Sequence, residues 1–238
     1  MILEICTNSF ESAMAAQKAG AHRIELCTEL SVGGVTPSFG FIEKVLSKLT
    51  MPVHVLIRPR SGNFTYTESE VDVMQKDIQQ CKKMGVAGIV TGALTLENEI
   101  DVETTQQLLL ASEGLDVTFH RAFDWCHNPN KSLQELQQLG VKRILTSGQQ
   151  PTAFEGLPLL KELKALSESI EIMPGGGIHS ENVVTFKKAG FTSVHCSASI
   201  KIQTLKHPPK VTMQNTLAEG VITYSSEEKI REILKKLA

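Results

Sequence analysis

The sequence has no excess of positive charge, no long apolar segment and no paired-cysteine motif. A formal charge of −2 and a pI near 6.4 exclude the basic surface that nucleic-acid partners require. No apolar run reaches the length of a membrane helix, so we expect no membrane partner. Met1 leads directly into a strand pattern without a charged leader, which predicts a cytoplasmic protein. The cysteines are odd in number (five), widely spaced and without CxxC, which is typical of free thiols.

Several catalytic motifs are also absent. No GxGxxG follows the first predicted strand and there is no P-loop, which disfavours a dinucleotide fold and a P-loop nucleotide site. No lysine lies at the C-terminal end of a predicted strand, which disfavours a Schiff-base aldolase. The first strand lacks an HxH pair, which weighs against a binuclear metallohydrolase. If the protein is an enzyme, proton transfer or hydrolysis is the expected chemistry.

A loose internal repeat predicts the fold. In each copy a helix ends, a glycine caps it and a short strand follows; the copies are KAGAHRIEL (18–26), KMGVAGIVT (83–91), QLGVKRILT (138–146) and KAGFTSVHC (188–196). Four further apolar runs lie between the copies: Ile2–Ile5, Val53–Ile57, Val117–His120 and Ile170–Pro174. Eight strand–helix units predict a single (β/α)8 TIM barrel over residues 1–238. A doubly wound sheet is the alternative, but it would not need four matching pairs.

Local signals predict where helices begin and where the chain departs from the repeat. Capping-box spacing predicts helix starts at Asn8, Thr67, Thr152 and Ser225, and simple N-caps are expected at Asp101 and Ser180. Residues 199–224, which include His207-Pro208-Pro209, carry few helix signals and are expected to form a long loop before a C-terminal helix over 225–237. Such a loop is usually functional or contacts another subunit.

The stretch VTFHRAFD (117–124) joins an apolar strand directly to three ionisable side chains, His120, Arg121 and Asp124. Burying these groups at a strand end is costly unless they meet partners or a ligand. One interpretation is a functional site. The alternative is an internal ion pair between Arg121 and Asp124, with His120 hydrogen-bonded in the core.

In a TIM barrel the active site lies at the C-terminal ends of the strands. Six side chains are predicted to converge at this mouth: Glu4, Glu25, Arg58, His120, Ser147 and His195. His120 is the predicted general acid or base, because the ordinary pKa of histidine lies near neutral pH. Glu4 or Glu25 would orient it or take a second proton, Arg58 would hold the charge of the substrate, and His195 is a further catalytic candidate. Arg58 and Arg60 have an alternative role, which is to pair with Glu4 and Glu25.

The glycine-rich segment PGGGI (174–178) and the segment CSAS (196–199) predict an anion site in the loops after strands seven and eight. Backbone amides and the expected helix start at Ser180 would attract a negative group. The predicted anion-binding residues are Gly175, Gly176, Gly177, Ser197, Arg60 and Ser147. The ligand would be a small phosphorylated or carboxylated metabolite. The alternative is that the glycines only form a tight turn.

A Glu-x-Cys pattern occurs on both the first and the second strand, and it places Cys6 and Cys27 near one level of the mouth. Two facing thiolates suit Cu(I), which is a soft ion. The alternative is a pair of reduced cysteines in the core.

These segments together resemble the copper homeostasis protein CutC family: LEICTNSFESAMAAQKAGAHRIELC, GGVTPSFG, IRPRSGNFTY, VTFHRAFD, RILTSG and MPGGGI…VHCSAS. The resemblance runs from Leu3 to about Ser199. It implies a cytoplasmic barrel, commonly a homodimer, that is associated with copper and binds Cu(I) through Cys6 and Cys27. It implies no reaction. Many family variants have a second cysteine where Thr7 stands here, which removes one candidate ligand.

Overall fold

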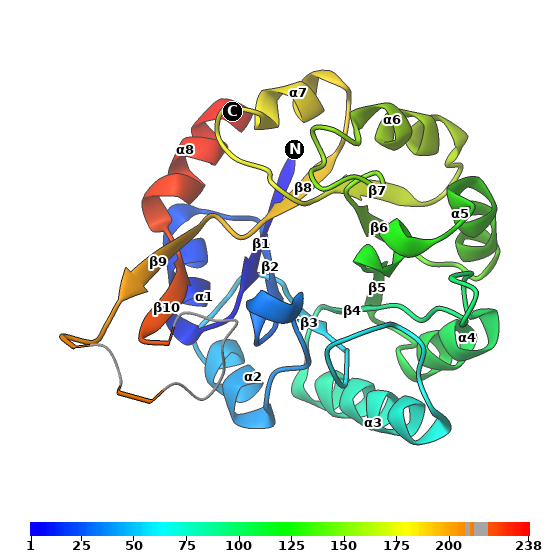
Figure 1. The fold of residues 1–238 in the computed structure, drawn as a ribbon, viewed down its shortest axis with the longest axis horizontal. Coiled ribbons are helices and arrows are strands. Elements are labelled where there is room, and N and C mark those ends of the chain that lie inside the picture. Colours follow the sequence, from blue (N-terminus) through cyan, green and yellow to red (C-terminus); the bar gives the residue numbers. More distant parts are fainter. Residues whose placement is uncertain (208–209, 212–218) are drawn as a thin grey trace.

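The chain folds into a barrel of eight parallel strands surrounded by helices (Figure 1). The computed structural model describes residues 1–207, 210–211 and 219–238. The strands are β1 Ile2–Thr7, β2 Arg23–Leu26, β3 Val53–Leu56, β4 Gly88–Thr91, β5 Asp116–Phe119, β6 Arg143–Thr146, β7 Glu171–Pro174 and β8 Ser193–Cys196. Their hydrogen-bonded order is β7-β6-β5-β4-β3-β2-β1-β8. A parallel bridge between Gly175 and His195 joins β7 to β8, the two strands at the ends of this order. The predicted TIM barrel is therefore confirmed.

Helices follow the strands and cover the barrel on its outside (Figure 1). They are α1 Phe10–Ala19, α2 Phe39–Leu46, α3 Glu68–Met84, α4 Val102–Ala111, α5 Pro129–Gln138, α6 Leu157–Leu166, α7 Val183–Lys188 and α8 Glu227–Leu237, with 3-10 turns η1 Leu30–Val32 and η2 Arg121–Trp125. Strand side chains alternate between faces, so Leu3 and Ile5 pack in the main apolar core while Glu4 and Cys6 lie on the other face. No helix in the described residues is long and apolar enough to cross a membrane.

The predicted helix starts are partly confirmed. Thr67 forms the full capping box of α3, and Asp101 caps α4. The cap of α1 is Ser9 and not Asn8, because the Ser9 side chain is the one that accepts a hydrogen bond from the backbone N–H of Ser12.

Three other predicted starts lie a few residues away from the helices. Ser226 and not Ser225 caps α8, since Ser225 is the last residue of a strand. Thr152 and Glu155 exchange the capping-box hydrogen bonds, but α6 begins only at Leu157. Ser180 caps no helix, because α7 begins at Val183. This last correction removes the helix N-terminus from the predicted anion site.

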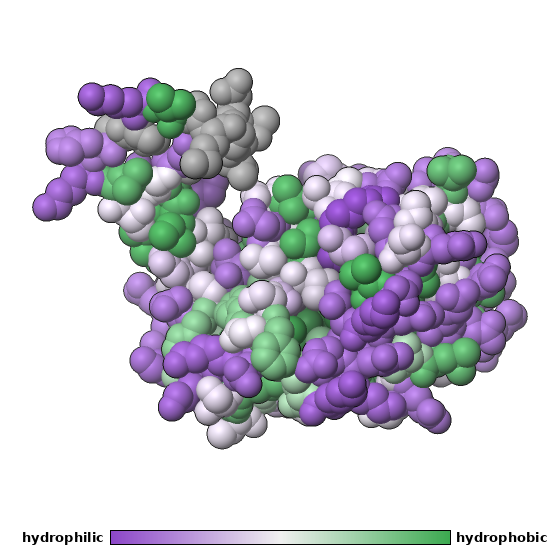
Figure 2. Space-filling model, turned by 90° about the horizontal axis from the view of Figure 1, so that it is seen from below, coloured by the Kyte–Doolittle hydropathy of each residue, from purple (hydrophilic) through white to green (hydrophobic). Residues whose placement is uncertain are grey.

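The segment expected to be a loop over 199–224 forms an antiparallel hairpin at its two ends. Strand β9, Ser199–Gln203, pairs with β10, Val221–Ser225, and the hairpin projects from the barrel (Figure 2). The β-branched residues of both segments favour strands, and Ile200, Ile202 and Ile222 stay at least one-third exposed. Pro208 and Pro209 lie outside the described residues.

Ion pairs occupy the interior of the barrel. Arg23 donates to Glu4, whose side chain is completely buried, and Arg143 donates to Glu171 at 2.6 Å and to Thr118 at 3.0 Å. Charges buried in this way remain only where each has a partner.

We expect Glu4→Gln to lower the free energy of unfolding at pH 7 by about 3 kcal/mol or more, because it leaves a buried arginine without its counter-ion. Contacts with His195 and Arg23 hold the pKa of Glu4 below its usual 4.5 despite its burial. The stabilisation by Glu4 is therefore complete above pH 4.5. As the pH falls further, the difference in free energy of unfolding between the wild type and Glu4→Gln should decrease. Urea denaturation at each pH measures the free energy of unfolding of both proteins. The exposed Glu113→Gln is the control, and an equal effect of both substitutions would contradict the prediction.

Candidate functional site

A cavity of about 470 Å³ opens at the C-terminal ends of the strands. Its lining includes eight of the predicted residues: Cys6, Glu25, Arg58, His120, Gly176, Gly177, His195 and Ser197. Five predicted residues are not part of the lining: Glu4, Cys27, Arg60, Ser147 and Gly175. His120 and His195 thus face one cavity, as the barrel prediction requires.

A chain of charges on β8, β1 and β2 forms the floor of the site. The strand register places Glu4 beside His195 on one side and Cys6 beside Glu25 on the other. His195 Nδ1 lies 2.8 Å from Glu4 Oε1 and 3.6 Å from Glu25 Oε2. Burial opposes the charged ring, but hydrogen bonds with Cys6 and Glu4 and the charges of Glu25 and Glu4 raise the pKa of His195 well above its ordinary value. His195 is therefore a buried cation at neutral pH.

For Glu25 the effect of burial on the pKa outweighs the effect of the neighbouring cations. Burial, together with the negative charge of Glu4, raises the pKa of Glu25 to about 7, although His195 and Arg23 act against this. Its Oε2 atom is buried and has no hydrogen-bond partner in the described part of the chain. Glu25 can therefore gain and lose a proton near neutral pH inside the cavity.

His120 does not have the near-neutral pKa on which its predicted role rests. Burial, and then the charge of Arg58, lower the pKa of His120 to about 3. Its Nδ1 accepts a hydrogen bond from the Ala122 N–H at 3.2 Å, so the neutral ring carries its proton on Nε2. The ring packs against Phe64, with the centroids 4.9 Å apart. His120 is therefore a neutral residue of the cavity wall.

Arg58 holds two loops at the rim of the cavity. It pairs with neither Glu4 nor Glu25, and its guanidinium lies 4.8 Å from the centroid of Phe64. It donates at 2.8–2.9 Å to three backbone carbonyls, those of Val32, Gly34 and Gly62. A Cβ atom at Gly34, whose φ is +86°, would lie only 2.7 Å from Leu56, so the close approach of this loop requires glycine.

Two of the predicted anion ligands, Arg60 and Ser147, are outside the lining and are held by contacts within the protein. Arg60 pairs with Glu70, the glutamate of the α3 capping box, on the outside of the barrel. Ser147 is fully buried, and its hydroxyl accepts from Arg121 Nη2 at 2.8 Å and lies 2.6 Å from the Gln150 carbonyl. Neither side chain is free to bind a ligand.

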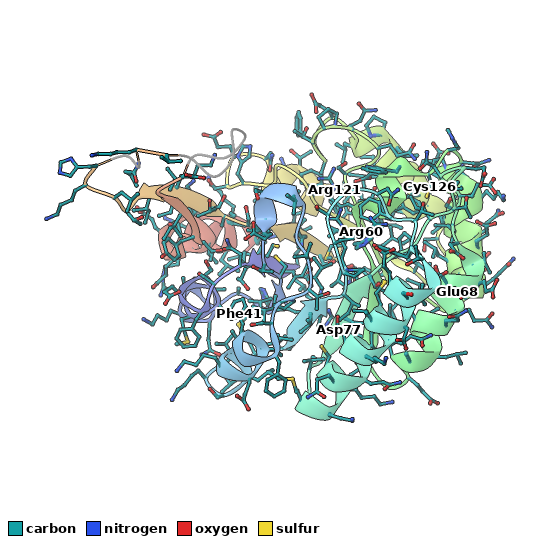
Figure 3. The ribbon with its side chains drawn as sticks, turned by 60° about the horizontal axis from the view of Figure 1, so that its bottom comes forward. Phe41, Arg60, Glu68, Asp77, Arg121 and Cys126 are labelled. Atoms are coloured by element: carbon teal, nitrogen blue, oxygen red, sulfur yellow. The ribbon has the colours of Figure 1, made fainter. Side chains whose placement is uncertain are left out.

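Arg121 and Asp124 form the ion pair that the sequence allowed, with Nε 2.7 Å from Oδ2. Both residues also line the cavity, as the functional interpretation of this stretch requires, although the predicted catalytic and anion-binding residues did not include them. The signal was the VTFHRAFD stretch itself, since Arg121 directly follows His120 there. Figure 3 labels Arg121 in the loop after β5 and Arg60 in the loop after β3.

The predicted thiol pair is close. Cys6 Sγ lies 3.6 Å from Cys27 Sγ, and both side chains are buried. Cys6 also belongs to a group with Glu25 and His195 whose possible metal-binding atoms all lie within 4.8 Å of one another. Since metal–thiolate bonds are about 2.3 Å long, both sulfur atoms are within reach of one ion.

The eight parallel strands and the cavity at their C-terminal ends define a (β/α)8-barrel protein. The model of the CutC family matches residues 1–200, and the chain belongs to this family. A CutC family protein of Photorhabdus laumondii is 51% identical over 197 residues, which are 83% of this chain and 79% of that protein. One of Glaesserella parasuis is 39% identical over 241 residues and spans 100% of this chain and 99% of its own length. A Streptococcus agalactiae crystal structure, named as a candidate copper homeostasis protein CutC, has a TM-score of 0.78 and 36% identity, and the match covers 83% of this chain and 98% of that chain.

Glu25→Gln should stabilise the protein at pH 8 and change its stability little at pH 4. A carboxyl whose pKa is raised on folding opposes folding once it is ionised, and this effect is full above about pH 7 and absent below about pH 4.5. We expect a melting temperature several degrees higher at pH 8, measured by differential scanning calorimetry. Glu113→Gln is again the control. A destabilised Glu25→Gln protein at pH 8 would contradict the raised pKa.

Proposed function

We propose that the cavity catalyses proton transfer or hydrolysis on a small anionic metabolite. The observation that carries this proposal is the Glu25 carboxyl: it lines the cavity beside His195, its pKa is raised to about 7 and its buried Oε2 atom has no described hydrogen-bond partner. In its ionised form Glu25 takes a proton from the substrate or from an attacking water. His195, held positive by Glu4, stabilises the negative charge that develops beside it.

The other predicted residues support these two groups. Glu4 positions His195 and keeps it charged, since it accepts from both His195 and Arg23. Arg58 fixes the rim loops, and His120 completes the wall without exchanging protons. Proton exchange thus rests with Glu25, and charge stabilisation rests with His195.

The test is isotope incorporation from solvent. Wild-type protein incubated in D2O or H2(18)O with pooled carboxylated and phosphorylated metabolites should label at least one of them, as seen by mass spectrometry. The rate should rise with pH through about 7, because Glu25 must be ionised. Glu25→Gln should reduce labelling by about 100-fold or more, while Glu113→Gln leaves it unchanged. No labelling, or equal labelling by Glu25→Gln, would refute the proposal.

A second function, Cu(I) binding in copper homeostasis, is favoured by one specific observation, the 3.6 Å separation of the Cys6 and Cys27 sulfur atoms. The donor set fits the ion, because two thiolates suit soft Cu(I) better than hard cations. The name given to the Streptococcus agalactiae relative supports the same function. The hydrogen bond with Cys27 and burial raise the pKa of Cys6 well above its ordinary value, so the Cys6 thiol must lose a proton to bind the ion.

Wild-type protein should bind one Cu(I) per chain in a competitive chelator titration, and Cys6→Ala/Cys27→Ala should lose this binding. Cys81→Ala/Cys126→Ala removes two other buried thiols and should bind normally. Affinity should increase with pH, because binding displaces thiol protons. Equal binding by the two double variants would remove the copper proposal.

We also propose that the protein is cytoplasmic and forms a homodimer. Its five free cysteines suit a reducing compartment. The projecting hairpin, with Ile200, Ile202 and Ile222 exposed, offers an apolar surface for a second copy of the chain.

A further inference from the structure

Arg121 presents one guanidinium nitrogen that the fold leaves unpaired. Its Nε donates to Asp124 at 2.7 Å and its Nη2 donates to Ser147 at 2.8 Å. No described residue accepts a hydrogen bond from Nη1. The side chain is 45% exposed and lines the cavity. Because the guanidinium is planar and two of its nitrogens are fixed, the direction of Nη1 is fixed as well.

Asp124 holds Arg121 without fully neutralising it. The Asp124 carboxylate also accepts the backbone N–H groups of Ser147 at 3.0 Å and Gln149 at 3.1 Å, and the hydroxyl of Thr146. Its negative charge is therefore shared among several donors. Asp124 acts as the anchor for an arginine that can still attract a second anion.

The glycine turn that lines the same cavity has two backbone amides without a described acceptor. Gly176 and Gly177 have φ of +105° and +72°, and no acceptor for either N–H occurs among the described residues. Their carbonyls are engaged, with the Ala153 N–H at 2.9 Å and the Asn182 amide at 2.8 Å respectively. These hydrogen bonds fix the turn, and both residues line the cavity.

Glycine at position 176 keeps the space next to the guanidinium open. A Cβ atom there would lie 3.4 Å from Arg121 Nη1 and 3.3 Å from the Cβ of Ser147. A side chain would therefore occupy the position in which a ligand atom can meet both the arginine and the turn.

The charges around the cavity favour an anion. The lining has three cations, Arg58, Arg121 and His195, against two carboxylates, Asp124 and Glu25. The Glu4 carboxylate next to His195 is also paired with Arg23, so the cations still outnumber the carboxylates. Arg58 has no carboxylate partner in the described structure, since its hydrogen bonds go to backbone carbonyls. The cavity is thus positive, and a positive cavity attracts anionic ligands.

We propose that Arg121 Nη1 and the amides of Gly176 and Gly177 bind the terminal oxyanion, phosphate or carboxylate, of the ligand in this cavity. The site differs from the predicted one, because Arg121 takes the place of Arg60 and Ser147 and no helix N-terminus contributes. That this ligand is also the substrate of Glu25 rests on the proposed function; the oxyanion site itself does not.

The experiment is isothermal titration of the full chain with inorganic phosphate at constant ionic strength, with acetate titrated separately. Wild-type protein should bind phosphate or acetate, and the tighter of the two identifies the preferred oxyanion. Arg121→Gln should weaken binding about 10-fold or more, the usual effect of losing a charge-assisted hydrogen bond. Arg60→Gln removes an equal charge outside the cavity and should bind as wild type does.

Arg121→Lys provides a second variant where Arg121→Gln does not fold. It retains the charge beside Asp124, but one ammonium group cannot replace the three fixed guanidinium nitrogens, so binding should still weaken. Binding of neither anion by the wild type, or unchanged affinity in the folded Arg121 variants, would overturn the proposal.

Glu25→Gln separates this inference from the proposed function. It should bind the oxyanion at least as tightly as wild type, because it removes a negative charge from the cavity. Phosphate binding without isotope incorporation would refute the catalytic proposal alone. Isotope incorporation with unchanged binding in the Arg121 variants would refute the oxyanion site alone.

Discussion

The rest of the site depends on the ion pairs that the buried carboxylate of Glu4 forms. It lies between Arg23 and His195, so it joins the interior ion pairs of the barrel to the floor of the cavity. The hydrogen bonds with Cys6 and Glu4 and the charges of Glu25 and Glu4 raise the pKa of His195. Burial, and then the charge of Glu4, raise the pKa of Glu25. Glu4 therefore contributes to both shifts, which favour a charged His195 and a Glu25 that can exchange a proton. The parallel register of β8, β1 and β2 brings the three groups together.

The two proposed functions use neighbouring groups and would therefore influence each other. Cys6 lies in one group with Glu25 and His195, with their donor atoms within 4.8 Å. A Cu(I) ion held by two thiolates adds a net negative charge at this place, which would raise the pKa of Glu25 further and strengthen the charge on His195. Copper binding would thus hold Glu25 in its protonated form. In this geometry a copper-loaded chain and a chain with an active base are different states of one site.

The sequence predicted the strands, because these follow from the periodicity of the apolar residues. It did not predict side-chain contacts in which the partner comes from another segment of the chain. The glycine-capped repeat and four further apolar runs predicted the eight strands, and strand parity predicted that Glu25 and His195 lie on the inner face. The prediction that Arg60 binds the anion was wrong, because Arg60 pairs with Glu70, ten residues further along the chain. Arg121 lines the cavity instead. The low pKa of His120 arises from its burial, with Phe64 of another loop packed on its ring. The sequence did not predict the hairpin, because a long segment separates β9 from β10 and no short turn motif joins the two strands.

The backbone strain of the described residues lies in loops at the mouth of the barrel. Four residues that are not glycine have a left-handed backbone, and each lies in a loop after a strand's C-terminal end: Glu29, Asn98, Gln149 and Ala198. Three of the nine buried polar atoms without a described hydrogen-bond partner belong to cavity residues, namely Glu25 Oε2, Arg58 Nε and His120 Nε2. Backbone strain persists only where the surrounding structure holds it in place. The ion pairs and apolar core below the mouth provide that support, and strain placed in the loops around a cavity favours a functional role for the mouth over a purely structural one.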